Sequence, residues 1–374
     1  MTRLARYAAA LVVDLAAALM PSHLRHWGCA MRHEVRAIER GALPFALGCL
    51  GGALIETFRP LLLSSRGSIA MRNSLPLHTR GHVAACAIAA TTLGLAYMAI
   101  GGAPVGYMAM NLGALLIGFL AVGIVTQVGR LWRVPAGAIA IVLGLALLAT
   151  AIGGASADGA TRWIRLGGLA IQPSLILLPV LALGYARSPD RLSTLGIVIA
   201  AAALAIQPDR AMAGALAFGM AALAIARPGR NVLIALAASA TGFAAAMLQP
   251  DVEPAMPWVD QILYSAFDVH PVAGLAVLGG SIVLLLPALT GYLSGTAGRE
   301  THLVFGAVWL AIVAAAALGN YPTPLVGFGG SAILGYLLSM TALPRRADPA
   351  AAERDSAPAA PGDAPAPDLR MAIG

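Results

Sequence analysis

The sequence of 374 residues is 59% hydrophobic and only 11% charged, with a mean hydropathy of +0.80. A soluble domain carries about a quarter charged residues, so this composition excludes an ordinary soluble protein and predicts a polytopic membrane protein. The formal net charge is +7, and the sequence contains arginine but no lysine. Because basic residues of membrane proteins gather in cytoplasmic loops, this charge does not indicate a nucleic-acid partner.

Residues 1–82 are predicted to form a basic, membrane-associated segment followed by a linker over 59–82. Residues 5–20 are apolar but short, and no signal-peptide cleavage site follows them. Residues 22–40 are basic and amphipathic, which is typical of a helix on an anionic membrane surface or of an ordinary cytoplasmic helix. We expect neither 5–20 nor 41–57 to span the membrane, so that the whole front end lies on the inner face.

Residues 83–343 are predicted to contain about ten membrane-spanning helices, each near the length of about 20 residues that a bilayer needs. The apolar segments cover residues 83–101, 105–127, 134–153, 174–187, 192–207, 211–227, 231–248, 271–293, 302–318 and 324–343. The predicted fold class is therefore an all-α polytopic membrane helical bundle. Residues 344–374 are rich in Pro, Ala and Asp, and predict a disordered cytoplasmic tail.

The loops between these spans fall into two sets of different charge. One set carries most of the arginines, namely Arg130, Arg133, Arg187, Arg191, Arg227, Arg230, Arg299, Arg345 and Arg346. The opposite set carries fewer arginines and many acids, namely Arg162, Arg165, Arg210, Asp158, Asp209, Asp251, Glu253, Asp260 and Asp268. The positive-inside rule places the first set in the cytoplasm, so both ends of the ten-helix unit are predicted to be cytoplasmic.

Three short motifs lie in the outward loops. Residues 162–174 contain R-W-I-R-L-G followed by Q-P-S, residues 207–209 are Q-P-D, and residues 323–331 are T-P-L-V-G-F-G-G-S. Arginine is costly in hydrocarbon, so the first motif predicts an interfacial loop or part of a water-accessible cavity. In this order the motifs resemble those of the SEDS family, the FtsW/RodA/SpoVE-like proteins of bacterial division, elongation and sporulation, over roughly residues 80–343.

The resemblance implies a ten-helix fold in the bacterial inner (cytoplasmic) membrane. It also implies a peptidoglycan glycosyltransferase, which polymerises glycan strands from lipid II during cell wall biogenesis linked to cell division or cell shape. Lipid II carries an undecaprenyl diphosphate. A class B penicillin-binding protein is the implied partner. A divalent metal, Mg²⁺ or Mn²⁺, is compatible with the family chemistry, and the resemblance implies that Asp260 is either a general base or the contact of this metal.

The outward loop 249–270 collects five titratable side chains, Asp251, Glu253, Asp260, Asp268 and His270. Composition alone favours a solvated loop whose acids avoid the cytoplasmic side. The resemblance implies an essential aspartate in this loop, and Asp260 falls on it, while Asp268 falls on a family glutamate. A carboxylate at this place can act as a general base for an attacking sugar hydroxyl. Asp260 is therefore the catalytic candidate, with Asp251 second.

The candidate substrate-binding residues lie in the first two motifs and directly after the second: Arg162, Trp163, Arg165, Gln172, Gln207, Asp209 and Arg210. Guanidinium groups recognise diphosphate oxygens by bidentate contacts, which is the role expected for the arginines. The alternatives are an interfacial position for Arg210 and a membrane-interface anchor for Trp163.

Two positions after Q-P-S depart from the family. Leu175 and Leu178 stand where the family has a glutamate and a lysine, and leucine can neither orient a lipid-linked substrate nor tune an acid. Three functions therefore stay open: the glycosyltransferase, a catalytically inactive SEDS-like scaffold or regulator of envelope synthesis, and a flippase for a lipid-linked precursor. The spans contain few ionisable residues, which argues against ion-coupled transport.

The cysteines and histidines suggest no further chemistry. Cys29, Cys49 and Cys86 are odd in number and widely spaced, so they predict neither a disulfide framework nor a metal site. The seven histidines form no ligand pair at helical spacing.

Overall fold

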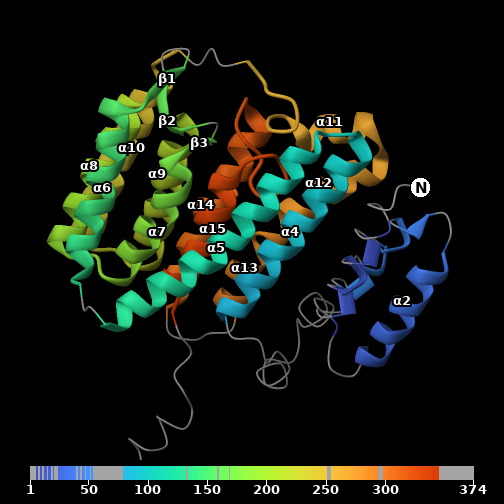
Figure 1. The fold of residues 1–374 in the computed structure, drawn as a ribbon. Helices are drawn as coiled ribbons and strands as arrows, with labels where there is room; N and C mark the ends of the chain where they lie inside the picture. The colour runs from blue at the N-terminus through green and yellow to red at the C-terminus, as the bar shows by residue number, and fades with distance from the viewer. Residues whose placement is uncertain are drawn as a thin grey trace, which may run out of the picture.

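The computed structural model describes residues 79–131, 134–157, 160–167, 169–250, 254–293 and 298–344, and residues 6–53 with gaps. Over these residues the chain is a bundle of helices with one small sheet at one end (Figure 1). Residues 345–374 and 54–78 lie outside the described residues, so the predicted tail and most of the predicted linker are not tested.

Each predicted span coincides with a helix, or with a helix pair for the eighth. The helices are α4 (Thr79–Gly101), α5 (Val105–Leu131), α6 (Ala136–Gly153), α7 (Pro173–Arg187), α8 (Arg191–Ile206), α9 (Arg210–Ala226), α10 (Arg230–Met247), α11 (Ile262–Val269), α12 (Pro271–Val283), α13 (Leu286–Leu293), α14 (Arg299–Leu318) and α15 (Gly330–Ala342). In the described residues six segments are long and apolar enough to cross a membrane, and α7, α8, α9 and α15 are shorter apolar helices. The predicted polytopic helical membrane fold is confirmed.

Residues 155–171, which include most of the first motif, form a small antiparallel sheet. Its strands are β1 (Ala155–Ala157), β2 (Ala160–Leu166) and β3 (Leu169–Ile171), in the order β1-β2-β3. Ile164 of β2 lies opposite Ile171 of β3. The hydrogen bonds between the strands satisfy backbone groups where the chain leaves the helical bundle.

The tenth predicted span needs a correction at its start. Its predicted start is residue 324, but α15 begins at Gly330. Pro324 has no backbone N–H, and Leu325 (φ 62°) and Gly329 (φ 152°) are in the left-handed region. Asn111 of α5 compensates for the missing helical bonds. Its Nδ2 donates to the Gly327 oxygen at 2.9 Å, and its Oδ1 accepts from the Gly329 nitrogen at 3.1 Å.

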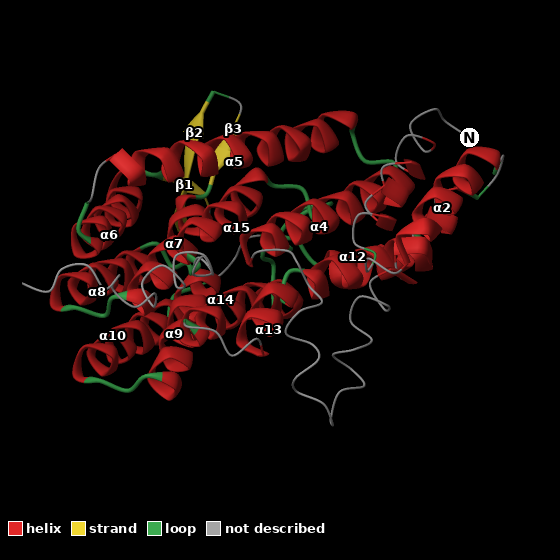
Figure 2. Ribbon diagram, turned by 90° about the horizontal axis from the view of Figure 1, so that it is seen from below, coloured by secondary structure: helices red, strands yellow, loops and turns green. Residues whose placement is uncertain are grey.

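Small residues let the helices of the bundle approach closely. Helix α6 packs on α8, α9 on α14, α4 on α12, and α15 lies against α5 and α7 (Figure 2). A Cβ on Gly196 of α8 would lie 2.5 Å from the Ala140 carbonyl carbon of α6. Since lipid removes the hydrophobic drive between helices, such close backbone contacts supply the packing energy.

The front segment packs against the side of the bundle. Helix α2 (Arg25–Ala37) occupies part of the predicted amphipathic stretch. Val35 of α2 belongs to an apolar cluster that also contains Leu93 and Ala96 of α4 and Ala276 of α12. Leu93 and Ala96 lie in the second half of α4 and not in its first turns. Whether residues 5–20 or 41–57 cross the membrane stays a prediction.

Candidate functional site

The three motifs meet at one end of the bundle because the helices alternate in direction. Helix α7 leads away from the sheet, α8 returns, and the α8–α9 loop carries residues 207–209 back to the sheet end (Figure 1). The α14–α15 loop and the segment 254–261 lie at this end as well. We call this the sheet end. The three motifs and the described part of the loop 249–270 that contains Asp260 are therefore brought to one side of the molecule.

The centre of the sheet end is a buried polar cluster, consisting of Arg162, Gln172, Ser174, Gln207 and Asp209. The Asp209 Oδ2 accepts hydrogen bonds from Ser174 Oγ at 2.8 Å and from Gln172 Nε2 at 3.1 Å. Its Oδ1 accepts from the Met212 backbone nitrogen at 3.2 Å and so caps α9. A buried carboxylate is stable only with such partners, and Asp209 is 0% exposed.

Arg162 joins the sheet to the second motif. Its Nη2 donates to the Pro208 oxygen at 2.8 Å, and the side chain is 3% exposed. The guanidinium carbon lies 5.7 Å from the Tyr321 ring centroid and 6.0 Å from that of Trp163. These distances are compatible with cation–π attraction. Arg165, three residues further along β2, is exposed instead.

The two glutamines of the motifs bind protein groups. The Gln172 backbone nitrogen donates to Ser331 Oγ at 3.0 Å, which ties the first motif to the third. Gln207 Nε2 donates to the Leu147 oxygen of α6 at 2.7 Å. With Asp209, these side chains hold the helix ends together. Their expected role in substrate binding stays a prediction.

Arg210 closes the end of α10. Its guanidinium donates to the backbone oxygens of Ala246, at 3.4 Å, and Gln249. Gln249 Nε2 in turn donates to the Ala205 oxygen of α8 at 2.6 Å. A cation near the last carbonyls of a helix is favourable because of the helix dipole. The expected contact of Arg210 with a diphosphate stays a prediction. The structure shows that Arg210 caps the end of α10.

Asp260 lies in a tight turn that the third motif holds in place. The Thr323 nitrogen donates to the Val259 oxygen at 3.0 Å, and the Phe328 nitrogen donates to the Trp258 oxygen at 2.7 Å. Trp258 (φ 68°) has left-handed backbone geometry. The Asp260 Oδ2 accepts from the Met256 nitrogen at 2.9 Å. Asp260 is thus positioned by backbone bonds next to residues 323–328.

The environment of Asp260 raises the pKa of its carboxyl group. The side chain is 9% exposed, and burial disfavours the charged form; the hydrogen bond from the Met256 N–H opposes this effect and is the smaller influence. Among the described residues, no hydrogen bond to its Oδ1 is present. Asp260 is therefore a carboxylate with one oxygen left for another partner.

The other titratable groups of this loop differ from Asp260. Asp268 on α11 is exposed. His270 is exposed too, and its Nδ1 accepts from the Val272 nitrogen at 3.1 Å, which caps α12. Asp251 and Glu253 lie outside the described residues. Of the two acids of this loop that the structure describes, Asp260 is buried and Asp268 is exposed.

Leu175 and Leu178 lie in the helix packing. They are 5% and 0% exposed, respectively. A Cβ on Gly335 of α15 would lie 1.9 Å from the Leu175 oxygen, so α7 and α15 are in backbone contact there. These two positions contribute apolar packing and no charge to the sheet end.

The described residues contain no group of three or more His, Cys, Asp or Glu side chains that could hold a metal ion. A divalent ion with few protein ligands, such as Mg²⁺, is commonly bound by one or two carboxylates together with substrate phosphates. Asp260 is compatible with binding of this kind, and the divalent ion stays a prediction.

Sequence reasoning missed Asn111 and the aromatic contacts around the third motif. Asn111 is 0% exposed in an otherwise apolar span, and a polar residue at membrane depth is a signal that could have found it. Tyr107 stacks on Phe328 with 3.9 Å between ring centroids, and Trp258 lies 5.5 Å from Tyr97. No pattern in the sequence distinguishes these rings from ordinary interfacial aromatics.

The fold and the sheet end define a polytopic helical membrane protein whose polar loops converge at one end of the bundle. No family model and no curated protein sequence matches the chain. The crystal structure of the rod shape determining protein RodA of Thermus thermophilus is similar, with 21% identity and a TM-score of 0.50, over 69% of this chain and 93% of that chain. A single-residue mutant of the same RodA is similar to the same extent, with 22% identity and a TM-score of 0.50. The chain therefore shares the RodA-like fold.

Proposed function

We propose that the chain is a SEDS-type peptidoglycan glycosyltransferase, which polymerises glycan strands from lipid II at the outer face of the bacterial inner membrane. The observation that carries the proposal is Asp260, a buried carboxylate fixed by backbone bonds beside the third motif. The RodA-like fold and the order of the three motifs support it. By the positive-inside rule the sheet end faces outward and both ends of the ten-helix unit are cytoplasmic.

Asp260 acts as the general base in this proposal. Its carboxylate removes the proton from a sugar hydroxyl while that oxygen forms a bond to an anomeric carbon. The bond from this carbon to undecaprenyl diphosphate breaks, and the diphosphate leaves with the electron pair. Burial raises the pKa of Asp260, and a base is more effective when its pKa approaches the working pH.

The diphosphate needs cationic partners at the sheet end. Arg165 is exposed on β2 and offers a planar guanidinium for bidentate contacts. Trp163 is half-buried beside Arg162, where its ring can face a sugar or the membrane interface. In place of the general-base role, Asp260 would hold a divalent metal together with the substrate diphosphate, and the metal would supply positive charge to the leaving group. The proposed partner protein is a class B penicillin-binding protein.

A polymerisation assay tests the proposal. The full chain is purified in detergent, supplied with fluorescent lipid II and Mg²⁺ or Mn²⁺, and assayed with and without a co-purified transpeptidase. Asp260→Asn is compared with Asp268→Asn, since Asp268 lies in the same loop but is exposed. We expect a glycan ladder from the wild type and from Asp268→Asn and none from Asp260→Asn. A ladder that survives in Asp260→Asn would transfer the catalytic role to another acid, with Asp251 next.

A second candidate function is a catalytically inactive SEDS-like scaffold or regulator of envelope synthesis. The observation that favours it is the burial of Leu175 and Leu178, where the resemblance expects a glutamate and a lysine. If neither the wild type nor the wild type with its transpeptidase forms a ladder, the scaffold becomes the better proposal. A pull-down with the transpeptidase then measures whether the chain still binds its partner.

A further inference from the structure

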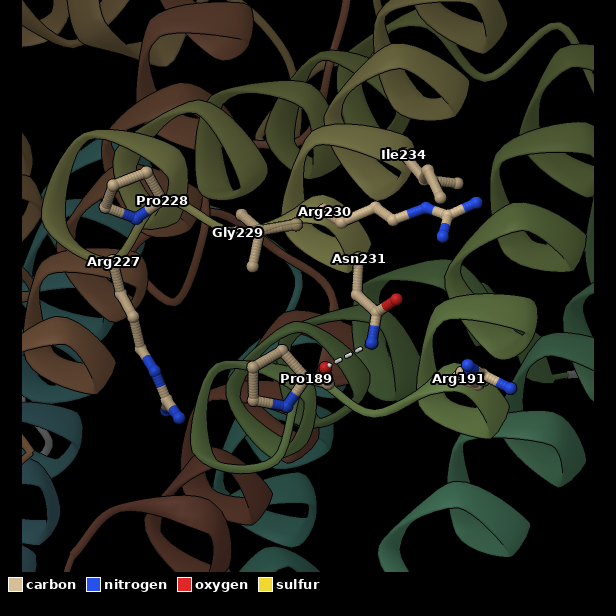
Figure 3. A pocket seen from close by; sticks show the side chains of 9 residues that line it. Pro189, Arg191, Arg227, Pro228, Gly229, Arg230, Asn231 and Ile234 are labelled. Carbon is tan, nitrogen blue, oxygen red and sulfur yellow. Dashed lines mark hydrogen bonds between the residues drawn. The ribbon is translucent and has the colours of Figure 1, made fainter.

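At the end of the bundle opposite the sheet, a pocket lies between the α7–α8 and α9–α10 loops. It has a volume of about 710 Å³ and is lined by Pro189, Arg191, Arg227, Arg230, Asn231 and Ile234, among others (Figure 3). Asn231 Nδ2 donates to the Pro189 oxygen at 2.9 Å and joins the two loops. The pocket is therefore built by residues about 40 positions apart in the sequence and not by one flexible loop.

The pocket concentrates positive charge. Arg191 and Arg230 extend to the same side of it, and Arg227 extends from the other side (Figure 3). Among the described residues, no group accepts a hydrogen bond from these three guanidinium groups or forms an ion pair with them, and no acidic side chain lines the pocket. Asp190, the acid next to Arg191, has its Oδ1 bound to the Ser193 nitrogen at 2.8 Å, as the cap of α8. An anion inside the pocket is therefore attracted by cations from two sides.

Helix α10 adds a further attraction for an anion. Its N-cap residue is Gly229, which has no side chain to accept from the first turn. The first backbone N–H groups of a helix lack partners inside the helix and carry the positive end of its dipole. Arg230 and Asn231 are the first residues of this helix and line the pocket.

The apolar surface below the arginines indicates a lipid and not a small soluble anion. Leu195 follows Arg191 by one helical turn and is 48% exposed. Ile234 follows Arg230 by one turn, lines the pocket and is 44% exposed. Arg191 and Arg230 therefore each have an exposed aliphatic side chain one helical turn further along their helix. A phospholipid carries the matching pair, a charged head and an acyl chain.

We propose that this pocket binds the headgroup of an anionic phospholipid, such as phosphatidylglycerol, between Arg191, Arg227 and Arg230. The planar guanidinium groups bind the phosphodiester oxygens, and the acyl chains lie along Leu195 and Ile234. Basic pockets between helices on the cytoplasmic side suit such headgroups. This site is independent of the proposed glycosyltransferase activity, which belongs to the opposite end of the bundle.

Lipid binding to the detergent-purified full chain tests the proposal. The probe is phosphatidylglycerol, its comparator is zwitterionic phosphatidylethanolamine, and native mass spectrometry counts the bound lipids. Arg191→Gln/Arg230→Gln removes two charges from the pocket. Arg187→Gln/Arg299→Gln removes two charges from the same end of the bundle outside it. We expect the pocket variant to bind phosphatidylglycerol roughly tenfold or more weakly, because each arginine near an anionic lipid contributes about a factor of five. The control variant should bind as the wild type does.

Three outcomes would overturn the proposal. The first is an equal loss of phosphatidylglycerol in both double variants, which would indicate general surface charge. The second is equal retention of phosphatidylethanolamine by the wild type. The third is displacement of phosphatidylglycerol by glycerol 3-phosphate or inorganic phosphate at similar concentration, which would indicate a site for a soluble phosphate. The last two measurements need only the wild type, so they decide the matter even if the pocket variant does not fold.

Discussion

At the scale of single residues, two buried aspartates at the sheet end have different surroundings. Asp209 accepts from Ser174, Gln172 and the Met212 nitrogen, so both of its oxygens are occupied by protein donors. Asp260 accepts from the Met256 nitrogen alone among the described residues. The first arrangement is that of a structural cap. The second leaves an acceptor for a reactant, which is why Asp260 and not Asp209 is the proposed base.

Replacing Asp260 by Asn should abolish polymerisation and yet stabilise the fold at neutral pH. The pKa of Asp260 in the folded protein is raised above its ordinary value of 3.8, so the folded protein holds this proton more tightly than the unfolded chain. The buried charge therefore destabilises the folded protein. This loss of stability begins as the pH rises above 3.8 and is complete above the raised pKa. Asn keeps the bond from Met256 without that charge.

Thermal unfolding in detergent between pH ~4 and ~8 measures this difference. We expect the midpoint of Asp260→Asn to exceed that of the wild type at the upper end of the range and to approach it at the lower end. A wild type that is more stable than the variant at neutral pH would contradict the burial argument.

Replacing Asp209 by Ala should destabilise the protein strongly. The change removes the α9 cap and leaves the donors of Ser174 and Gln172 without their acceptor. A lost cap costs about 1 kcal/mol and each buried unsatisfied group about 1–3 kcal/mol, so we expect a loss of roughly 3 kcal/mol. Asp190→Ala is the matched control, because Asp190 is an exposed cap of α8 with one bond, to Ser193. Equal shifts of the two unfolding midpoints would refute a special role for the buried cluster.

At the scale of the helices, the crossing of α7 and α15 depends on one glycine. The backbone of α7 at Leu175 passes so close to Gly335 that no side chain fits between them. This contact places the Q-P-S motif beside Ser331, whose hydroxyl accepts from the Gln172 nitrogen. The packing of two helices therefore determines the meeting of two motifs.

Gly335→Ala should separate α7 from α15. The new Cβ would lie 1.9 Å from the Leu175 oxygen, and overpacking of this kind costs about 1–3 kcal/mol. Gly184→Ala is the control: it lies in α7, and its added Cβ would meet nothing within 4 Å. Alanine favours helix over glycine, so the control should unfold at the same temperature as the wild type or higher. A Gly335→Ala variant as stable as the control would show that the crossing tolerates a side chain.

Hydropathy located the helices but not the structure at their ends. Hydropathy reports the free energy of transferring side chains into lipid. By that measure residue 324 already belongs to the last span. The backbone of residues 323–329 is irregular because Asn111, far away in the sequence, supplies the hydrogen bonds that a helix would otherwise make. In the same way, the pairing of β2 with β3 depends on bonds between strands and leaves no trace in hydropathy.

At the scale of the whole molecule, the alternating direction of the helices separates two chemical faces. The sheet end carries Asp260, Arg162 and Asp209, and the opposite end carries the arginine-lined pocket. The positive-inside rule predicts that the pocket faces the cytoplasm. The proposed transferase site and the proposed lipid site then face the two opposite leaflets.

Cysteine labelling should confirm this orientation. Arg165→Cys at the sheet end and Arg227→Cys at the opposite end are both exposed, and each is introduced after Cys29, Cys49 and Cys86 are replaced by Ser. In intact cells whose outer membrane has been opened, a membrane-impermeant maleimide should label Arg165→Cys. It should label Arg227→Cys only after the inner membrane is broken. The reverse pattern would invert the topology and remove the proposed transferase site from the outer face.

The sequence by itself determined the class of protein, the approximate places of the apolar helices and the asymmetry of charge between the loops. These follow from the cost of placing each side chain in lipid or water, which is a local property of the chain. It also singled out Asp260, Arg162 and Asp209 as candidates. Only the tertiary structure decided that Asp209 is enclosed by Ser174 and Gln172, while one Asp260 oxygen has no hydrogen bond to the described residues, and that distant arginines share a pocket. Hydrogen bonds and cavities depend on residues far apart in the chain, and those meet only when the helices pack.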